Sequence, residues 1–421
     1  MPDAAAGWLL PVVFVATYLA MAAGRVPRFR IDRTGMAFIG AVVLLACGAV
    51  TSRQAAGFID LPTLVMLFGL MVLSTQFEIA GAYGWCAARI AGYRGSPLVL
   101  LALVVAVAGG LSAVVANDVV AFAMTPLLCA GLTARGLDPR PYLIALAGAS
   151  NAGSAATIIG NPQNILIAQA GALDFWRFLL VCGPPALMGM ACVFATVAFV
   201  WHGAFRRQAA ATNSVADPPT VHPPAVDRPA LAKALAATML LVALFASPLP
   251  HEVAVAGVAA LLFVSRRHET RSLMAGVDWS LIVLFASLFV VTGAMSASAY
   301  GAGAAAWIAL GRVDLAALGP LAGFSLLASN TVGNVPAVML LLSVWPAPGE
   351  AALQALAVLS THAGNLLLIG SLANLIVSER ARRSGVVLDF RTHARCGIPM
   401  ALASLGASLA WFSLLGPLAW R

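Results

Sequence analysis

One carboxylate, Asp118, stands in the middle of a long apolar stretch of the sequence. A charge placed inside a bilayer costs about 2.5–3.5 kcal/mol on insertion scales, so such a group must be paired, protonated or in contact with water. Asp118 could therefore carry a proton or bind a cation. It could also cap the helix that follows it by accepting hydrogen bonds from free main-chain N–H groups. The sequence leaves both roles open.

Asparagines recur where the apolar stretches are interrupted. They are Asn117, Asn151, Asn161, Asn164, Asn330, Asn334, Asn365 and Asn374. Each side chain offers one acceptor and two donors, so the set could bind an oxyanion, a small cation or neutral hydroxyl groups. Each one alone could equally satisfy the main chain of a broken helix. Because the set recurs in both halves of the chain, we interpret it as the lining of a ligand site.

A histidine and several glycines accompany these amides. His362 lies within a predicted membrane crossing and aligns with Asn151 of the other half, so it could place a titratable group there. A buried histidine bonded to a main-chain carbonyl is the alternative. The glycines allow close helix approach and unusual main-chain conformations, and they are Gly153, Gly160, Gly333, Gly364 and Gly370. Because the sequence has no P-loop, HExxH or GxSxG motif, we expect no enzyme activity.

The composition excludes an ordinary soluble protein. Of 421 residues, 61% are hydrophobic and 10% are charged, against about 45–50% and about 25% in an average soluble domain. The net charge of +8 does not indicate a nucleic-acid partner, because the basic residues form short clusters between apolar segments. The 6 cysteines show no CxxC spacing and predict neither a zinc site nor disulfides. The composition therefore predicts an all-α polytopic membrane protein whose partner is the lipid bilayer.

The apolar segments predict about 10 transmembrane helices. We place them near 8–24, 35–50, 61–80, 142–170, 177–202, 234–247, 253–265, 278–297, 352–378 and 395–419. Two further stretches, 97–128 and 316–345, are too long for one helix and too short for two full crossings. Each has a polar break, Ala116-Asn117-Asp118 in one and Ser329-Asn330-Thr331 in the other. Such segments suit re-entrant hairpins, whose tips are tolerated only where protein or water satisfies the main chain.

The basic residues also predict an orientation. With the N-terminus outside, most of the 24 Lys and Arg residues fall in loops on the inner side, as the positive-inside rule requires. The proline-rich segment 205–233 then becomes a cytoplasmic linker. We expect no cleaved signal peptide, because the first apolar segment lacks an Arg-rich start and a small-residue cleavage site.

The halves on either side of the linker resemble each other. Met66-Leu67-Phe68-Gly69 resembles Val283-Leu284-Phe285-Ala286, the two hairpin breaks correspond, and Gly160-Asn161-Pro162-Gln163-Asn164 corresponds to Gly370-Ser371-Leu372-Ala373-Asn374. The predicted organisation is N-terminal scaffold helices in 1–60, a first inverted repeat in 61–204, the linker in 205–233, second-half scaffold helices in 234–277 and a second repeat in 278–421. An inverted repeat with two broken helices in matching positions points to a secondary transporter.

These motifs resemble the ion transporter superfamily, which contains arsenite permeases, NhaD-type sodium/proton antiporters, citrate (CitMHS-like) permeases and divalent anion/sodium symporters. Ala116-Asn117-Asp118 with Thr125-Pro126 is similar to the arsenite-permease pattern, and Ser329-Asn330-Thr331 matches the signature of the dicarboxylate symporters. Gly160-Asn161-Pro162-Gln163-Asn164 is similar to a sodium-site loop of those symporters. Asp118 stands where the symporters have Thr, which makes proton coupling plausible.

The resemblance implies a dimeric transporter with an elevator mechanism and a site shared by both halves. The substrate-binding residues expected are Asn117, Asn151, Asn164, Ser329, Asn330, Thr331, Asn334 and Asn374. The coupling-ion residues expected are Asp118, Gly160, Asn161, His362 and Gly370, with Na⁺ at Asn117, Gly160, Asn330 and Gly370 as one possibility. No cofactor is expected beyond H⁺ or Na⁺, and a separate ATPase subunit stays possible.

Together these observations predict an inner-membrane secondary transporter for a small anion, either an inorganic species such as arsenite or a di- or tricarboxylate. Uptake or efflux is open, because inward basic loops do not set the direction. A Na⁺/H⁺ antiporter of the same superfamily and a passive anion channel are the alternatives. A membrane-embedded enzyme or anchoring protein would need a soluble domain or a nucleophile–base pair, neither of which the sequence contains.

Overall fold

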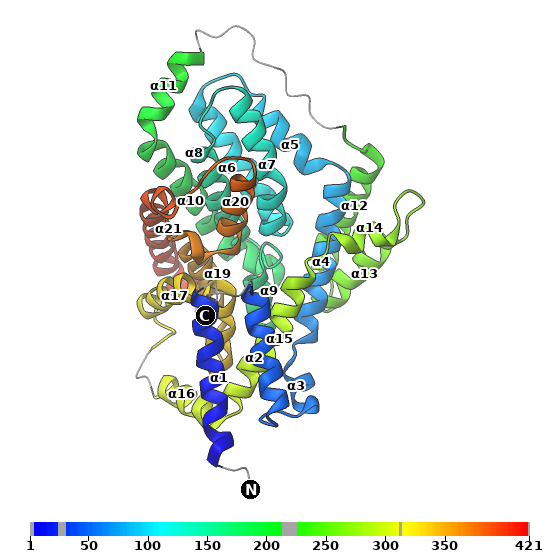
Figure 1. Ribbon diagram of the computed structural model, residues 1–421, viewed down its shortest axis with the longest axis vertical. Coiled ribbons are helices and arrows are strands. Elements are labelled where there is room, and N and C mark those ends of the chain that lie inside the picture. Colours follow the sequence, from blue (N-terminus) through cyan, green and yellow to red (C-terminus); the bar gives the residue numbers. More distant parts are fainter. Residues whose placement is uncertain (1–3, 24–30, 213–224, 311–313, 420–421) are drawn as a thin grey trace.

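The computed structural model describes residues 4–23, 31–212, 225–310 and 314–419, and within these ranges its regular structure is helical (Figure 1). Residues 24–30 of the first basic loop and 213–224 of the predicted linker lie outside the described residues. The helices that precede the linker are α1 (Ala4–Ala23), α2 (Arg33–Ala46), α3 (Ser52–Phe58), α4 (Leu61–Ile79), α5 (Ala82–Ala91), α6 (Pro97–Val114), α7 (Asn117–Ala134), α8 (Arg140–Ser154), α9 (Pro162–Gly171), α10 (Phe175–Val200) and α11 (His202–Thr212).

The helices after the linker follow a similar order. They are α12 (Arg228–Leu244), α13 (His251–Phe263), α14 (Thr270–Ala275), α15 (Trp279–Ser296), α16 (Ala299–Ala309), α17 (Leu318–Val332), α18 (Asn334–Val344), α19 (Glu350–Ala363), the short 3-10 helix η1 (Leu368–Gly370), α20 (Leu372–Arg383) and α21 (Phe390–Ala419).

Several helices are long and apolar enough to cross a membrane. In the described part of the chain these are Leu61–Ile79, Pro97–Val114, Asn117–Ala134, Phe175–Val200, Trp279–Ser296 and Phe390–Leu414. Shorter apolar helices cover Trp8–Ala22, Arg33–Ala46, His251–Phe263 and Asn334–Val344. The prediction of an all-helical, multi-pass membrane protein is therefore confirmed.

Both predicted hairpins contain a break at the expected place, but the first is longer than predicted. Its arms α6 and α7 have 18 residues each, because α7 continues past the predicted end at 128. The expectation that this stretch is too short for two crossings is therefore wrong. In the second hairpin, α17 has 15 residues and α18 has 11. Its turn depends on Gly333, whose φ of 98° and ψ of 154° are strongly unfavourable for residues with a Cβ.

Aspartates set the starts of several helices. Asp60 accepts a hydrogen bond from the main-chain N of Thr63 at the start of α4 (3.2 Å), and Asp278 accepts one from Leu281 at the start of α15 (3.0 Å). A side-chain acceptor at the N-cap satisfies a main-chain donor that has no partner within its helix. These caps fix where α4 and α15 begin, and both helices border the site described below.

Helices from the two parts of the chain pack on one another in a reciprocal way. α13 packs on α4 while α2 packs on α15, and α20 packs on α7 while α18 packs on α9. Within each part, α6 packs on α8 and α17 packs on α19. Figure 1 places the N-terminal end, α3 and α16 at the lower end of the molecule, and α5 and α11 at the upper end. The two parts of the chain therefore form one interlocked body.

Candidate functional site

Two predicted crossings are interrupted in the middle. The segment 142–170 consists of α8 and α9 separated by residues 155–161, and the segment 352–378 consists of α19, η1 and α20. A helix that stops inside the molecule leaves main-chain carbonyl groups without partners at its end. These groups need side-chain donors nearby.

Two asparagines supply these donors in the same way. The Nδ2 of Asn164 donates to the carbonyl oxygens of Ser154 (3.2 Å) and Thr157 (2.9 Å). The Nδ2 of Asn374 donates to those of Gly364 (2.9 Å) and Leu367 (3.2 Å). In both loops the amide thus contacts the carbonyl groups ten and seven residues before it. Asn164 and Asn374 therefore occupy equivalent positions.

Asn151 of α8 joins the two broken helices. Its Oδ1 accepts hydrogen bonds from Asn117 Nδ2 (3.1 Å) and Ser371 Oγ (2.9 Å). Its Nδ2 donates to the Oδ1 atoms of Asn365 (2.7 Å) and Asn374 (3.3 Å). Asn151 is fully buried, so every hydrogen-bonding position of its side chain is used inside the protein.

A reciprocal contact comes from α19. Thr361 Oγ1 accepts hydrogen bonds from Gln163 Nε2 (3.1 Å) and Asn161 Nδ2 (3.4 Å), which both belong to the first broken helix. Each half thus reaches into the loop of the other. We call the amides that form this buried network the amide cluster, and they are Asn117, Asn151, Asn161, Asn164, Asn365 and Asn374.

The structure corrects one alignment. Because Asn164 and Asn374 are equivalent, the residue opposite Asn151 is Thr361, one position before His362. The His362 ring points instead toward α10 and α21, where Nδ1 lies 3.0 Å from Ser408 Oγ and Nε2 lies opposite Gly189. His362 is not brought to the amide cluster.

The glycine loops fit closely around the cluster. A Cβ at Gly160 would overlap the carbonyl oxygen of Ser154, and one at Gly370 would overlap Asn330 Oδ1. The main-chain N of Asn117 donates to the carbonyl oxygen of Gly160 (3.1 Å), which ties the first hairpin to the first broken helix. Gly160 is therefore needed for close contact between main chains, and Gly370 for close contact with the Asn330 side chain.

Only some of the predicted site residues in the second hairpin bond to the second broken helix. Asn330 donates to the carbonyl oxygen of Ala363 (2.8 Å) and accepts from the main-chain N of Leu367 (3.1 Å), so it fastens α17 to the second broken helix. Ser329 Oγ donates to the carbonyl oxygen of Ser360 (3.4 Å). Thr331 is exposed and donates only to carbonyl groups of its own helix. Asn334 lies on the far side of the turn and lines a different cavity.

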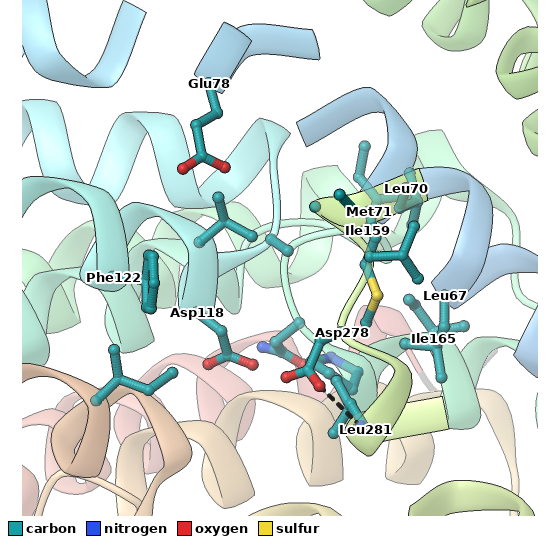
Figure 2. Close-up of a pocket in the computed structure, with 18 residues that line it drawn as sticks. Leu67, Leu70, Met71, Glu78, Asp118, Phe122, Ile159, Ile165, Asp278 and Leu281 are labelled. Carbon is teal, nitrogen blue, oxygen red and sulfur yellow. Dashed lines mark hydrogen bonds between the residues drawn. The ribbon is translucent and has the colours of Figure 1, made fainter. Parts of the chain in front are cut away.

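Asp118 opens onto a cavity of about 340 Å³ next to the amide cluster. Asp278 and Glu78 also line it, and none of its lining residues is Lys, Arg or His. Figure 2 shows the carboxylates of Asp118 and Asp278 directed into the same space, with Glu78 on the far side. We call this space the acidic cavity. Asn161 and Phe122 also line it, so it connects the hairpin, the amide cluster and α15.

The structure shows no hydrogen bond by which Asp118 would cap α7. Asp118 lies in the first turn of α7, but no side chain caps that helix, and Asp118 accepts no hydrogen bond within the part of the chain that the structure describes. Its carboxylate is thus available to a proton, a cation or water in the acidic cavity.

Two buried amide oxygens are also available. Asn117 Oδ1 and Asn164 Oδ1 have no hydrogen-bond partner among the described residues. Both belong to the first half of the cluster, whereas Asn330 Oδ1 is occupied. Among the described residues no group of three or more His, Cys, Asp or Glu side chains could hold a metal ion.

Some site residues were not expected from the sequence. Asp278 and Glu78 line the acidic cavity, and both stand at or near a helix end, where a charged residue is common. Thr361 and Ser371 bond to the cluster, although hydroxyl residues are common in membrane helices. The signal that could have found Asp278 is its position at the start of the apolar segment 278–297, as a carboxylate that begins α15.

Comparisons with known proteins agree with this architecture. An uncharacterised transporter of Mycobacterium tuberculosis is 28% identical over 421 residues, which cover 96% of this chain and 97% of that protein. The silicon efflux transporter LSI3 of Oryza sativa is 28% identical over 447 residues, covering 90% of this chain and 91% of LSI3.

Two solved structures share the fold. The YdaH transporter of Alcanivorax borkumensis matches with a TM-score of 0.59 at 16% identity, covering 98% of both chains. MtrF of Neisseria gonorrhoeae, from a class of antimetabolite efflux pumps, matches with a TM-score of 0.52 at 14% identity, covering 97% of this chain and 94% of MtrF. The citrate transporter model, CitMHS, matches residues 16–361. The chain therefore belongs to the citrate transporter family and is a membrane transporter, not an enzyme.

Proposed function

We propose that this protein is a secondary active transporter that moves a small anion across the cell inner membrane, coupled to H⁺ or Na⁺. The observation that carries the proposal is the pair of broken helices joined through the amide cluster, with the unpaired carboxylate of Asp118 beside them. Breaking a helix frees N–H groups at one end and carbonyl groups at the other, which suits the binding of an anion and a cation without fixed charges.

Two inverted repeats account for the packing. If α1–α10 and α12–α21 are equivalent, then the contacts of α13 with α4 and of α2 with α15 are one contact made twice, and so are those of α20 with α7 and of α18 with α9. The equivalent positions of Asn164 and Asn374 support the same assignment. The repeats then include the scaffold helices that precede each hairpin.

The proposed orientation has the N-terminus outside and the linker 205–233 in the cytoplasm. It is supported by the gathering of the N-terminal end, α3 and α16 at one end of the molecule, with α5 and α11 at the other (Figure 1). The acidic cavity would then be reached from the cytoplasmic side, since Glu78 and Asp278 lie at the predicted inner ends of α4 and α15.

Asp118 is the proposed coupling group. Its free carboxylate and the unpartnered oxygens of Asn117 and Asn164 could serve a proton or a sodium ion. A body in which both broken helices are bonded together suits an elevator mechanism, with the scaffold helices of a homodimer held still. The substrate classes that we favour are inorganic oxyanions and di- or tricarboxylates, and no separate ATPase subunit is needed for this cycle.

The test is ion-driven uptake by the purified protein in proteoliposomes. Citrate, succinate, phosphate, arsenite and antimonite are offered under imposed proton and sodium gradients. The variants are Asp118→Asn and, as a matched control, Asp138→Asn, which changes a partly buried aspartate paired with the exposed Arg140. We expect Asp118→Asn to abolish accumulation driven by a gradient while solute binding is retained, and the control to transport normally. Unchanged accumulation in Asp118→Asn would remove the coupling role.

A Na⁺/H⁺ antiporter is the second candidate. The absence of basic residues from the lining of the acidic cavity favours it, because such a cavity attracts cations. Exchange of Na⁺ for H⁺ that needs no added solute would identify this activity. Flux that follows the solute gradient alone and never accumulates solute would indicate a passive channel.

A further inference from the structure

A second and larger cavity, of about 640 Å³, lies beside the acidic cavity. It is bounded by the start of α2, the turn of the second hairpin, the start of α15 and the end of α20. Asp278 and Leu281 line both cavities, so the two spaces share a wall. We call the second space the Arg33 cavity after the basic residue nearest to the hairpin turn. Its volume is in the range of small-molecule sites, about 300–1,000 Å³.

Arg33 is held against the turn between α17 and α18. One guanidinium nitrogen is 3.5 Å from the carbonyl oxygen of Ile369, and the other lies 3.2 Å from where a Cβ on Gly333 would stand. No carboxylate of the described residues lies within ion-pairing distance of Arg33. The guanidinium group therefore keeps most of its five N–H donors unused.

The carboxylates of this cavity are already engaged. Asp32 caps α2 by accepting from the main-chain N of Gly35 (2.8 Å), and Asp278 caps α15. Glu379 pairs with Arg382 at 3.7 Å, and with Arg383 of the same helix at 3.0 Å. Each of these carboxylates thus has a local partner, and none of them forms an ion pair with Arg33, although they line the cavity together with Arg33 and Arg382.

Asn334 adds further donors on the same wall. It is only 5% exposed, yet its side chain uses only Oδ1, which accepts from the main-chain N of Val335 (3.0 Å). Its Nδ2 and its own main-chain N–H have no partner among the described residues. Asn334 is also the first residue of α18, where the helix dipole favours negative charge. Arg33 and Asn334 together present donors and no free acceptor.

We propose that the Arg33 cavity binds the oxyanion group of the transported solute, a carboxylate or a tetrahedral oxyanion, through the guanidinium of Arg33 and the free side-chain NH2 and main-chain N–H of Asn334. This inference rests on the proposed transport function and names the substrate class of its site. The solute and the coupling ion then occupy neighbouring cavities, with Asp278 in the wall between them. Arg33 selects solutes that carry a negative charge over uncharged hydroxy compounds such as silicic acid.

The experiment measures binding to the purified full-length protein at neutral pH, by equilibrium dialysis with labelled citrate, succinate, sulfate and phosphate. The variants are Arg33→Gln, Arg33→Lys and, as a control, Arg53→Gln, which changes an exposed arginine in α3. A charge-assisted, two-pronged hydrogen bond is strong, so we expect roughly tenfold or greater weakening in Arg33→Gln. Arg33→Lys keeps the charge without the fork geometry and should weaken binding less.

The choice of labelled anions also distinguishes the two chemical classes of ligand. A loss for citrate and succinate alone assigns a carboxylate, and a loss for sulfate and phosphate alone assigns a tetrahedral oxyanion. Silicic acid should not compete with the bound anion. If Arg33→Gln does not fold, Asn334→Asp replaces the free amide with a carboxylate of nearly the same shape, and it should also weaken anion binding.

Unchanged anion affinity in Arg33→Gln would overturn the inference. If Arg33→Gln does not fold, unchanged affinity in Asn334→Asp would do so. An equal loss of affinity in the control Arg53→Gln would also overturn it. Suppose that wild type accumulates solute, that Asp118→Asn does not, and that Arg33→Gln binds anions as tightly as wild type. The inference then fails and the proposed function stands. If anion binding depends on Arg33 but no gradient drives uptake, the proposed function fails and the anion site stands.

Discussion

Replacing Asn151 with alanine tests whether the amide cluster holds the two halves together. The substitution removes four side-chain hydrogen bonds, two accepted from Asn117 and Ser371 and two donated to Asn365 and Asn374. Hydrogen bonds between helices in membrane proteins contribute about 0.6 kcal/mol each on average, with a maximum of about 1.7 kcal/mol. We therefore expect Asn151→Ala to lower the free energy of unfolding by about 2–3 kcal/mol.

A denaturing-detergent titration of the purified protein in mixed micelles measures this change. The 9 tryptophans supply the fluorescence signal. Asn334→Ala is the matched control, because Asn334 is also a buried asparagine at a helix break but makes only one local hydrogen bond. We expect the control to lose about 0.5 kcal/mol or less.

Asn151→Asp distinguishes hydrogen bonding from packing. The carboxylate keeps the size and the acceptors of the amide, but it loses the two donors and faces the amide oxygens of Asn365 and Asn374. It should therefore destabilise the protein at least as much as alanine does. If both Asn151 variants stay within about 0.5 kcal/mol of wild type, the cluster does not join the two halves energetically, and the reasoning is refuted.

Further predictions concern packing and orientation. Gly153→Ala should lower the unfolding midpoint, because its Cβ would overlap the main chain of α6, and overpacking typically costs about 1–3 kcal/mol. The control Gly110→Ala should be neutral, because no atom lies within 4 Å of the position of its Cβ. Gly333→Ala should be destabilised by a similar amount, since its φ of 98° strains any residue with a Cβ, and normal stability would contradict the described turn. A membrane-impermeant maleimide should label the exposed Cys47 from outside intact cells and reach Cys86 only after permeabilisation, and the reverse pattern would invert the proposed orientation. Burial raises the pKa of the Cys86 thiol, so its labelling in permeabilised cells should be slow at pH 7 and accelerate as the pH rises and the thiolate forms.

The sequence predicted which residues would sit at the breaks but not how they would bond. The asparagines could be found because amides are costly in an apolar stretch and recur in both halves. Their partners could not, because the contacts of Asn151 with Asn374 and of Thr361 with Gln163 join residues about 200 positions apart. One-residue errors in aligning weak repeats, such as His362 for Thr361, follow from the same lack of three-dimensional information.

The charged residues of the two cavities were harder to identify. Arg33 and Asp278 each stand at the end of an apolar segment, where basic residues mark the inner side of the membrane and aspartates begin helices. The helix-start interpretation is confirmed for Asp278, which does cap α15. Only the fold places these helix ends beside the hairpin turns.

The neutrality of the amide cluster has an electrical consequence. The groups that bond the two broken helices are amides, hydroxyls and main-chain groups, and none carries a formal charge. Moving one elementary charge across a potential of 100 mV takes about 2.3 kcal/mol, whereas moving this cluster takes no such work. In the proposed transport cycle, the membrane potential therefore acts only through the ions, the solute and the few charged side chains beside them, so exchanging Asp118 for Asn should change the charge moved per solute.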